Sequence, residues 1–155
     1  MTRPIPEYTV AELERLNAIE FPSLTNDEAV DLGLVAVSVI RGWNLSLAVD
    51  VRIGYDLVFR AKLGDTGAEH DSWLAGKAAV AVHFGEPSLL VRLRHVDAGS
   101  RFTDLDLDHD AMKAHGGSIP LRVGRAIIGT LTMSGEPDGI DHEAAAEAIA
   151  RYLAS

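Results

Sequence analysis

The segment from Ala114 to Gly135 constrains the fold of this chain more than any other part of the sequence. It places a histidine before two glycines, then two short apolar runs separated by Gly124-Arg125, and it ends on a glycine before an acidic stretch. Two short apolar runs around a glycine-containing turn are typical of a β-hairpin. We therefore expect a tight turn at residues 115–117, strands over about 119–123 and 126–134, and a closing helix over about 139–154.

A second hairpin is predicted upstream, where apolar runs over 45–52 and 55–63 flank Ile53-Gly54. The pattern Thr-x-x-Glu, in which the hydroxyl and the carboxylate satisfy free amides at a helix start, occurs at Thr9, Thr25 and Thr66. These capping boxes predict helices over about 9–18, 26–41 and 67–84.

Residues 87–99 are ambiguous. Their alternation suits a strand, whereas Ser88 as a cap and Gly99 as a stop suit a helix. Residues 100–117 are expected to form a loop with one short helical turn. Two hairpins with segregated helices predict an α+β sandwich with a central antiparallel sheet, as a single domain over 1–155. Residues 1–20 would be an N-terminal arm and short helix.

Composition excludes several classes of function. The formal charge of −9 disfavours nucleic acid, because phosphate binding needs a basic patch. The one basic cluster, at Arg92, Arg94, His95 and Arg101, is interpreted as a solvated face. The chain has no cysteine, which excludes disulfides and thiolate chemistry. No apolar run approaches the roughly 20 residues of a membrane span, and the N-terminus lacks a signal-peptide core, so we expect a cytoplasmic protein without membrane contact.

Motifs for metal or nucleotide chemistry are not matched. The alternating aspartates of 104–110 resemble a calcium loop, but His109 and His115 stand where an EF-hand needs glycine and glutamate. No His-Glu-x-x-His zinc motif, nucleophile elbow, Walker loop or Gly-x-Gly-x-x-Gly pattern is present. Hydrolase and nucleotide-dependent activities therefore have no support in the residues.

His115 is the best-placed candidate for a ligand-binding residue. Gly116 and Gly117 permit backbone conformations closed to other residues and would let a flat ligand approach. Imidazole is also a common axial ligand of haem iron. The alternative is that His115 hydrogen-bonds a backbone carbonyl and only stabilises the turn.

Trp73 and Lys77 form a second candidate, since residues four apart share one face of a helix. An indole beside an ammonium could cover a flat anionic ligand. The alternative, which we favour from sequence, is a core tryptophan with the lysine stem lying along it.

Several of these motifs together resemble the GlcG/HbpS-like family, often called haem-degrading domain proteins, and within it the small branch that includes a yeast cytosolic member. The resemblance covers the chain from about residue 20 and rests on the motifs Leu47-Ala-Val-Asp-Val-Arg52, Asp71-x-Trp-Leu-x-x-Lys77, Phe84-Gly85, Ala114-His-Gly-Gly-x-Ile-Pro-Leu-Arg-Val123, Ile128-Gly-Thr-Leu-Thr-Met-Ser-Gly135 and Asp141-His142. It implies a profilin-like or PAS-like layout and a homo-oligomer, and it favours a helix over 87–99.

The resemblance also implies haem or a related tetrapyrrole as ligand. In that hypothesis His115 is the metal ligand, Gly116 and Gly117 admit the ring, Trp73 walls the pocket, and Lys77 and Arg52 pair with propionates. Slow haem degradation would need an external reductant, because the chain has no flavin or nicotinamide motif. The competing hypothesis is a non-enzymatic oligomeric interaction or assembly module without a cofactor.

Overall fold

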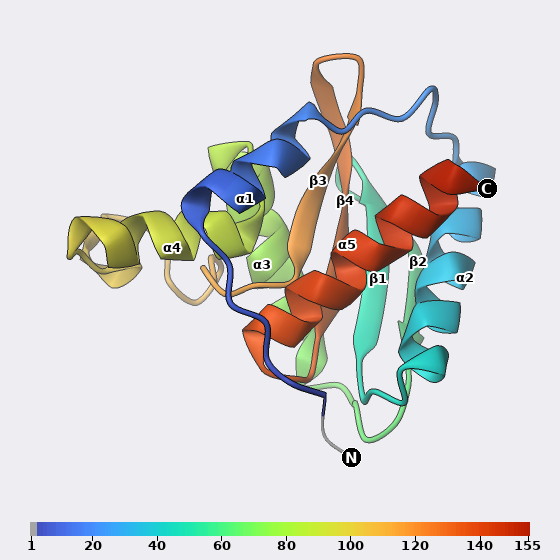
Figure 1. Ribbon diagram of the computed structural model, residues 1–155, viewed down its shortest axis with the longest axis horizontal. Coiled ribbons are helices and arrows are strands. Elements are labelled where there is room, and N and C mark those ends of the chain that lie inside the picture. The colour runs from blue at the N-terminus through green and yellow to red at the C-terminus, as the bar shows by residue number, and fades with distance from the viewer. Residues whose placement is uncertain (1–2) are drawn as a thin grey trace.

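The fold is a four-stranded antiparallel sheet with helices on both faces, seen in a computed structural model that describes residues 3–155 (Figure 1). The elements in chain order are α1 (Val10–Glu14), the 3₁₀ helix η1 (Arg15–Ala18), α2 (Asn26–Gly42), β1 (Ala48–Ile53), β2 (Asp56–Lys62), α3 (His70–Phe84), α4 (Ser88–Ala98), the 3₁₀ helix η2 (Phe102–Asp104), β3 (Ser118–Val123), β4 (Ala126–Ser134) and α5 (Asp138–Ala154). The strands are ordered β2-β1-β4-β3, so β1 and β4 join the two predicted hairpins at the sheet centre. The predicted α+β class and antiparallel sheet are confirmed.

The two faces of the sheet differ in chemistry because side chains alternate along each strand. Helices α2 and α5 cover one face, where Val49, Val51, Leu131 and Met133 belong to the main hydrophobic core. Helix α3 packs on the other face, mainly against β3 and β4. That second face carries buried polar side chains at Asp50, Ser118, Thr130 and Thr132.

The helix starts follow local capping chemistry in two of the three predicted cases. Thr9 and Thr25 form complete capping boxes with Glu12 and Glu28. The box predicted at Thr66 is wrong, because its hydroxyl donates to Leu63 O at 3.0 Å and α3 begins only at His70. The His70 Nδ1 accepts from Gly67 N at 3.1 Å instead.

Residues 88–98 are helical, as expected from the resemblance, but Ser88 does not cap this helix. The buried Ser88 hydroxyl accepts a hydrogen bond from Ser118 N at 3.0 Å and so joins α4 to the start of β3. The N-cap position is Pro87, which has no capping side chain. The loop over 100–117 contains the single short helix η2, as predicted.

The N-terminal arm lies across the start of α5 (Figure 1). Tyr8 packs edge-on against the buried His142, with ring centroids 5.0 Å apart. The Arg3 guanidinium pairs with Glu143 at 2.6 Å. Burial lowers the pKa of His142 to about 4, although the Asp138 carboxylate opposes this, so the imidazole is neutral at pH 7.

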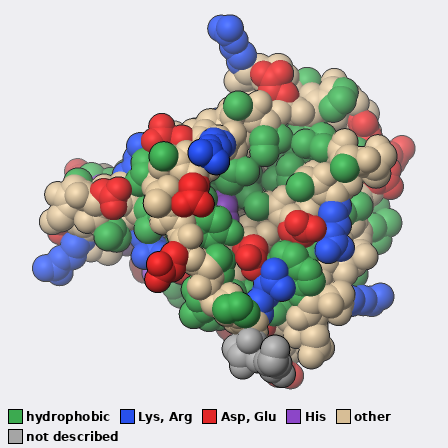
Figure 2. All heavy atoms as spheres, in the orientation of Figure 1, with side chains coloured by type: hydrophobic (Ala, Val, Ile, Leu, Met, Phe, Trp, Pro, Cys, Tyr) green, Lys and Arg blue, Asp and Glu red, His purple; other side chains and the backbone are tan. Residues whose placement is uncertain are grey.

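The surface carries charges of both signs. On the face with α1 and α5, basic side chains are interspersed with acidic ones (Figure 2). Within residues 3–155 no helix is both long and apolar enough to span a bilayer.

Candidate functional site

A pocket of about 510 Å³ lies where the start of α3 meets the start of α5. It is lined by residues from four separate parts of the chain: Glu69, His70, Trp73, Lys77, Arg92, His115, Ser134, Gly135, Glu136, Pro137, Asp138 and Asp141. The structure therefore brings three predicted site residues, Trp73, Lys77 and His115, to one cavity. We call this cavity the His115 pocket.

The imidazole of His115 lies exposed at the wall of this pocket. Its ring stands edge-on to the Trp73 indole, with centroids 5.4 Å apart and planes at 73°. Within residues 3–155 the ring makes no hydrogen bond, so the predicted alternative of a carbonyl-bonded turn histidine is not what the structure places here. Partial desolvation lowers the pKa of His115, with the Asp138 carboxylate opposing. The ring is therefore neutral at pH 7 and keeps a nitrogen lone pair.

Trp73 is 39% exposed and does not belong to the core that the favoured interpretation assigned it to. The Lys113 ammonium lies 4.8 Å from the centre of its ring. The indole is thus held between a cation and the edge of His115, with part of its surface open to the pocket. An aromatic wall of this kind can cover a flat ligand.

Lys77 is buried beneath the pocket and is already paired. Its side chain is 3% exposed, and Nζ donates to Asp141 Oδ2 at 2.9 Å and to Met133 O at 3.0 Å. The other oxygen of Asp141 accepts from Glu136 N at 3.0 Å. Burial raises the pKa of Asp141 to about 6, against the lowering effect of Lys77. The ion pair joins α3 to α5, and a ligand carboxylate would have to displace Asp141 to reach the ammonium.

Gly116 and Gly117 pack closely against neighbouring backbone. Both are buried, and neither is among the residues that line the pocket. A Cβ on Gly116 would lie 2.4 Å from Asp138 O, and one on Gly117 would lie 2.2 Å from Met133 O. Gly117 also has a φ of +137°. The pair allows close backbone approach to β4 and α5, and it positions His115 beside the pocket.

Asp138 and Arg92 are pocket residues that the sequence did not reveal. Arg92 Nε donates to Asp138 Oδ2 at 2.8 Å, and Gly116 N donates to the same oxygen at 3.1 Å. Asp138 therefore ties the His115 turn to α4 and α5. The basic cluster that contains Arg92 was interpreted as a solvated face, and only the packing of α4 reveals that Arg92 lines the pocket.

Arg52 does not share the His115 pocket. It lies near the end of β1, where its guanidinium pairs with Asp50 at 3.1 Å and lines a separate groove. The first residue of β1, Ala48, pairs with Ser134, which lines the pocket, so the last residues of β1 lie at the opposite end of the sheet. The expectation that Arg52 and Lys77 hold the same ligand is not supported by this placement.

No metal cluster of protein side chains accompanies the pocket. Among residues 3–155, no three His, Asp or Glu side chains converge as metal ligands. A metal centre at His115 would therefore need a metal that arrives with most of its own ligands, as haem iron does.

Comparison with known proteins identifies the family. Residues 24–150 match the model of the family described as haem degrading protein HbpS-like, and the chain belongs to this family. It is 36% identical to a UPF0303 protein of Streptomyces coelicolor over 148 residues, 94% of each chain. It is 31% identical to a UPF0303 protein of Paraburkholderia xenovorans over 139 residues, covering 88% of this chain and 84% of the relative.

Solved structures share the fold at lower identity. The Ybr137w protein superposes with a TM-score of 0.84 at 21% identity, covering 96% of this chain and 90% of that one. HbpS superposes with a TM-score of 0.68 at 20% identity, covering 87% and 93%. A PduOC–heme complex superposes with a TM-score of 0.67 at 22% identity, covering 83% and 94%.

Proposed function

We propose that this protein binds haem or a related tetrapyrrole in the His115 pocket, with the His115 imidazole as the iron ligand. The observation that carries this proposal is the His115 imidazole at the pocket wall, which stands edge-on to Trp73 and makes no hydrogen bond within residues 3–155. His70 and His109, by contrast, each bond through a ring nitrogen within the protein, so their rings are less free to bind a ligand.

The surroundings of His115 support a flat ligand. Trp73 offers an aromatic surface beside the imidazole, and a cavity of about 510 Å³ falls in the usual range of roughly 300–1,000 Å³ for small-molecule sites. Family membership supports the same ligand class, since the family is described as haem degrading. A solved relative of similar fold is a heme complex.

The pairing of ligand carboxylates is assigned differently from the sequence prediction. Lys77 is committed to Asp141, and Arg52 lies in another groove. We propose Arg92 at the pocket edge as the partner of one propionate, because its Nε and Nη2 bind Asp138 and its Nη1 has no partner among the described residues. Since Glu69 and Glu136 also line the pocket, the second propionate is expected to point into solvent.

A haemin titration followed by visible spectroscopy tests the proposal. The wild-type protein should give a sharp, saturable Soret shift at one haemin per chain, and His115→Ala should abolish the shift while unfolding as the wild type does. His83→Ala is the matched control. It removes an exposed histidine on α3, outside the His115 pocket, and should leave the shift unchanged. Broad, non-saturating absorbance that is the same in all three proteins would overturn the proposal.

The proposal extends to slow degradation of the bound haem. Oxidative opening of a porphyrin consumes dioxygen, together with electrons that activate it, and the sequence holds no flavin or nicotinamide motif to deliver those electrons. We therefore propose slow degradation only with an external reductant. Ascorbate added to the haemin complex should bleach the Soret band over time, and persistence of the band would limit the function to binding.

A second candidate function, a non-enzymatic homo-oligomeric assembly module, is favoured by one observation. Tyr55 is fully exposed and Leu57 is 44% exposed at the hairpin end of the edge strand β2. Exposed apolar side chains on a sheet edge are a surface for association. Light scattering of wild-type and Tyr55→Ser proteins tests this function, and a monomer in both cases would exclude it.

A further inference from the structure

A second cavity of about 510 Å³ lies against the face of α3 opposite to the one that borders the His115 pocket. Residues 75, 79 and 82 of α3 line it, and at 100° per residue they lie roughly opposite residues 73 and 77. We call it the Arg52 groove, and its lining comprises Arg52, Gly54, Tyr55, Ala75, Ala78, Ala79, Val82, His83, Met112, Ile127, Ile128, Gly129 and Thr130.

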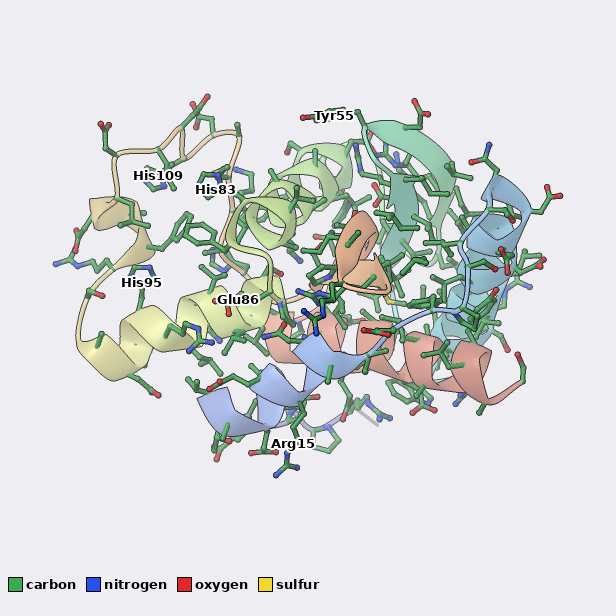
Figure 3. All side chains as sticks on the ribbon, turned by 90° about the horizontal axis from the view of Figure 1, so that it is seen from above. Arg15, Tyr55, His83, Glu86, His95 and His109 are labelled. Carbon is green, nitrogen blue, oxygen red and sulfur yellow. The ribbon has the colours of Figure 1, made fainter. Side chains whose placement is uncertain are left out.

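The walls of the groove are mostly apolar. Ala75, Ala78 and Ala79 form its α3 side with the smallest apolar side chains, which leaves room beside the helix. Tyr55 at the tip of the β1–β2 hairpin and His83 on α3 also line the groove, and both lie in the upper half of Figure 3. An apolar groove of this size fits the body of a small organic molecule.

A buried hydroxyl in the groove lacks a partner among the described residues. Thr130 is 1% exposed, and its Oγ1 makes no hydrogen bond within the described residues. A buried hydroxyl without a partner is unfavourable, and native proteins rarely keep one. A bound molecule with an oxygen near Thr130 would satisfy it.

Arg52 belongs to an ion-pair network that runs along β1 and β2 to the start of α3. Asp50 Oδ2 pairs with Arg52 and Arg60, each at 3.1 Å. Asp71 pairs with Arg60 at 3.2 Å and with Lys62 at 2.9 Å. Two carboxylates thus face three cations, in a chain whose formal charge is −9. Arg52 is the cation that lines the groove, and its Nη1 has no partner among the described residues.

We propose that the Arg52 groove binds an amphipathic organic monoanion, with its apolar body along α3 and its acidic group on Arg52. Three observations concern the groove itself: mostly apolar walls, a buried hydroxyl without a partner and an arginine whose Nη1 has no partner among the described residues. The site shares no lining residue with the His115 pocket, so it stands independently of the proposed haem site.

A matched pair of fluorescent probes separates the apolar and the charged parts of this recognition. The anionic probe is 8-anilinonaphthalene-1-sulfonate, and the neutral probe is N-phenyl-1-naphthylamine, which has the same rings without the sulfonate. The wild-type protein should bind the anionic probe saturably, one per chain, and about tenfold more tightly than the neutral probe, as expected for one charge-assisted contact. Octanoate should displace the anionic probe.

Three variants locate the binding. Arg52→Gln removes the charge but keeps a donor for Asp50, so it should weaken the anionic probe about tenfold and leave the neutral probe unchanged. Ala75→Phe fills the groove from an exposed helix position and should abolish binding of both probes. Ala150→Phe, at an exposed position of α5 outside the groove, is the control and should bind like the wild type.

Specific outcomes overturn the proposal. Probe binding that survives Ala75→Phe, or that is lost in His115→Ala instead, would place the probes elsewhere. Binding that declines as the protein concentration rises would mean that a second copy covers the groove. Ala75→Phe leaves the Arg52–Asp50 pair in place, so it decides the question even if Arg52→Gln unfolds.

Discussion

Replacing Lys77 by methionine removes the cation that compensates a buried carboxylate. Lys77 and Asp141 are 3% and 1% exposed, and their charged atoms lie 2.9 Å apart. Removing one partner of a buried ion pair costs about 3–5 kcal/mol, because the remaining charge is left without compensation. At roughly 2–4 °C per kcal/mol for a domain of this size, Lys77→Met should lower Tm by about 6–20 °C.

Removing both charges should cost less than the sum of the single changes. In Lys77→Met/Asp141→Asn no uncompensated carboxylate remains, so we expect a coupling energy of about 1–3 kcal/mol. Urea unfolding at pH 7.5, followed by circular dichroism for the wild type, both single variants and the double variant, measures it. The loss in Lys77→Met should shrink at pH 5, because burial raises the pKa of Asp141 and its carboxyl then becomes neutral.

Two results would refute this reasoning. The first is additivity of the single changes within about 0.5 kcal/mol, which would mean that the two groups do not interact. The second is a Lys77→Met protein that loses less than about 1 kcal/mol, as an exposed ion pair would. Either result would also mean that Asp141 does not hold Lys77 strongly, so Lys77 would be available to pair with a ligand carboxylate.

Three further predictions concern stability and are measured by urea unfolding. His142 has a pKa of about 4 in the fold against 6.5 for the free side chain, so its contribution is complete above pH 6.5 and is lost as the pH falls toward 4. The wild type should therefore lose about 2 kcal/mol more than His142→Gln between pH 7 and pH 5, and equal slopes would contradict this. Gly117→Ala should lower the free energy of unfolding by more than about 2 kcal/mol, because Gly117 has a positive φ and a Cβ would meet the Met133 oxygen. Gly42→Ala is the control: it has open space around it, so the free energy of unfolding should stay the same or rise by up to about 1 kcal/mol. Thr25→Ala should cost about 1 kcal/mol through loss of the cap, and an unchanged stability would mean that this capping box is not formed in solution.

The fold was predictable where local chemistry decides it. The capping boxes at Thr9 and Thr25 and the two hairpins use residues close in sequence, and all four are found. Thr66 failed because Leu63 O and the His70 ring offered competing hydrogen bonds. The helix over residues 88–98 could be predicted only from the family resemblance, because periodicity alone left the pattern ambiguous between strand and helix.

The candidate site was predictable only in part. His115 was singled out by its glycine turn and Trp73 and Lys77 by their helical spacing, and the structure brings all three to one pocket. The sequence could not show that Asp141, 64 residues away, neutralises Lys77. Arg92 lines the pocket and Arg52 lines a separate groove, which the sequence could not show because the direction of β1 and the packing of α4 are tertiary features.

The location of a bound porphyrin tests the central claim most directly. Gallium protoporphyrin IX, added to ¹⁵N-labelled protein, reports its site through changes in backbone amide shifts. The account predicts the largest changes at Trp73, His115 and Asp138, which line the His115 pocket. Changes concentrated at Val82 and Thr130, in the Arg52 groove, would contradict the assignment of the porphyrin site to His115.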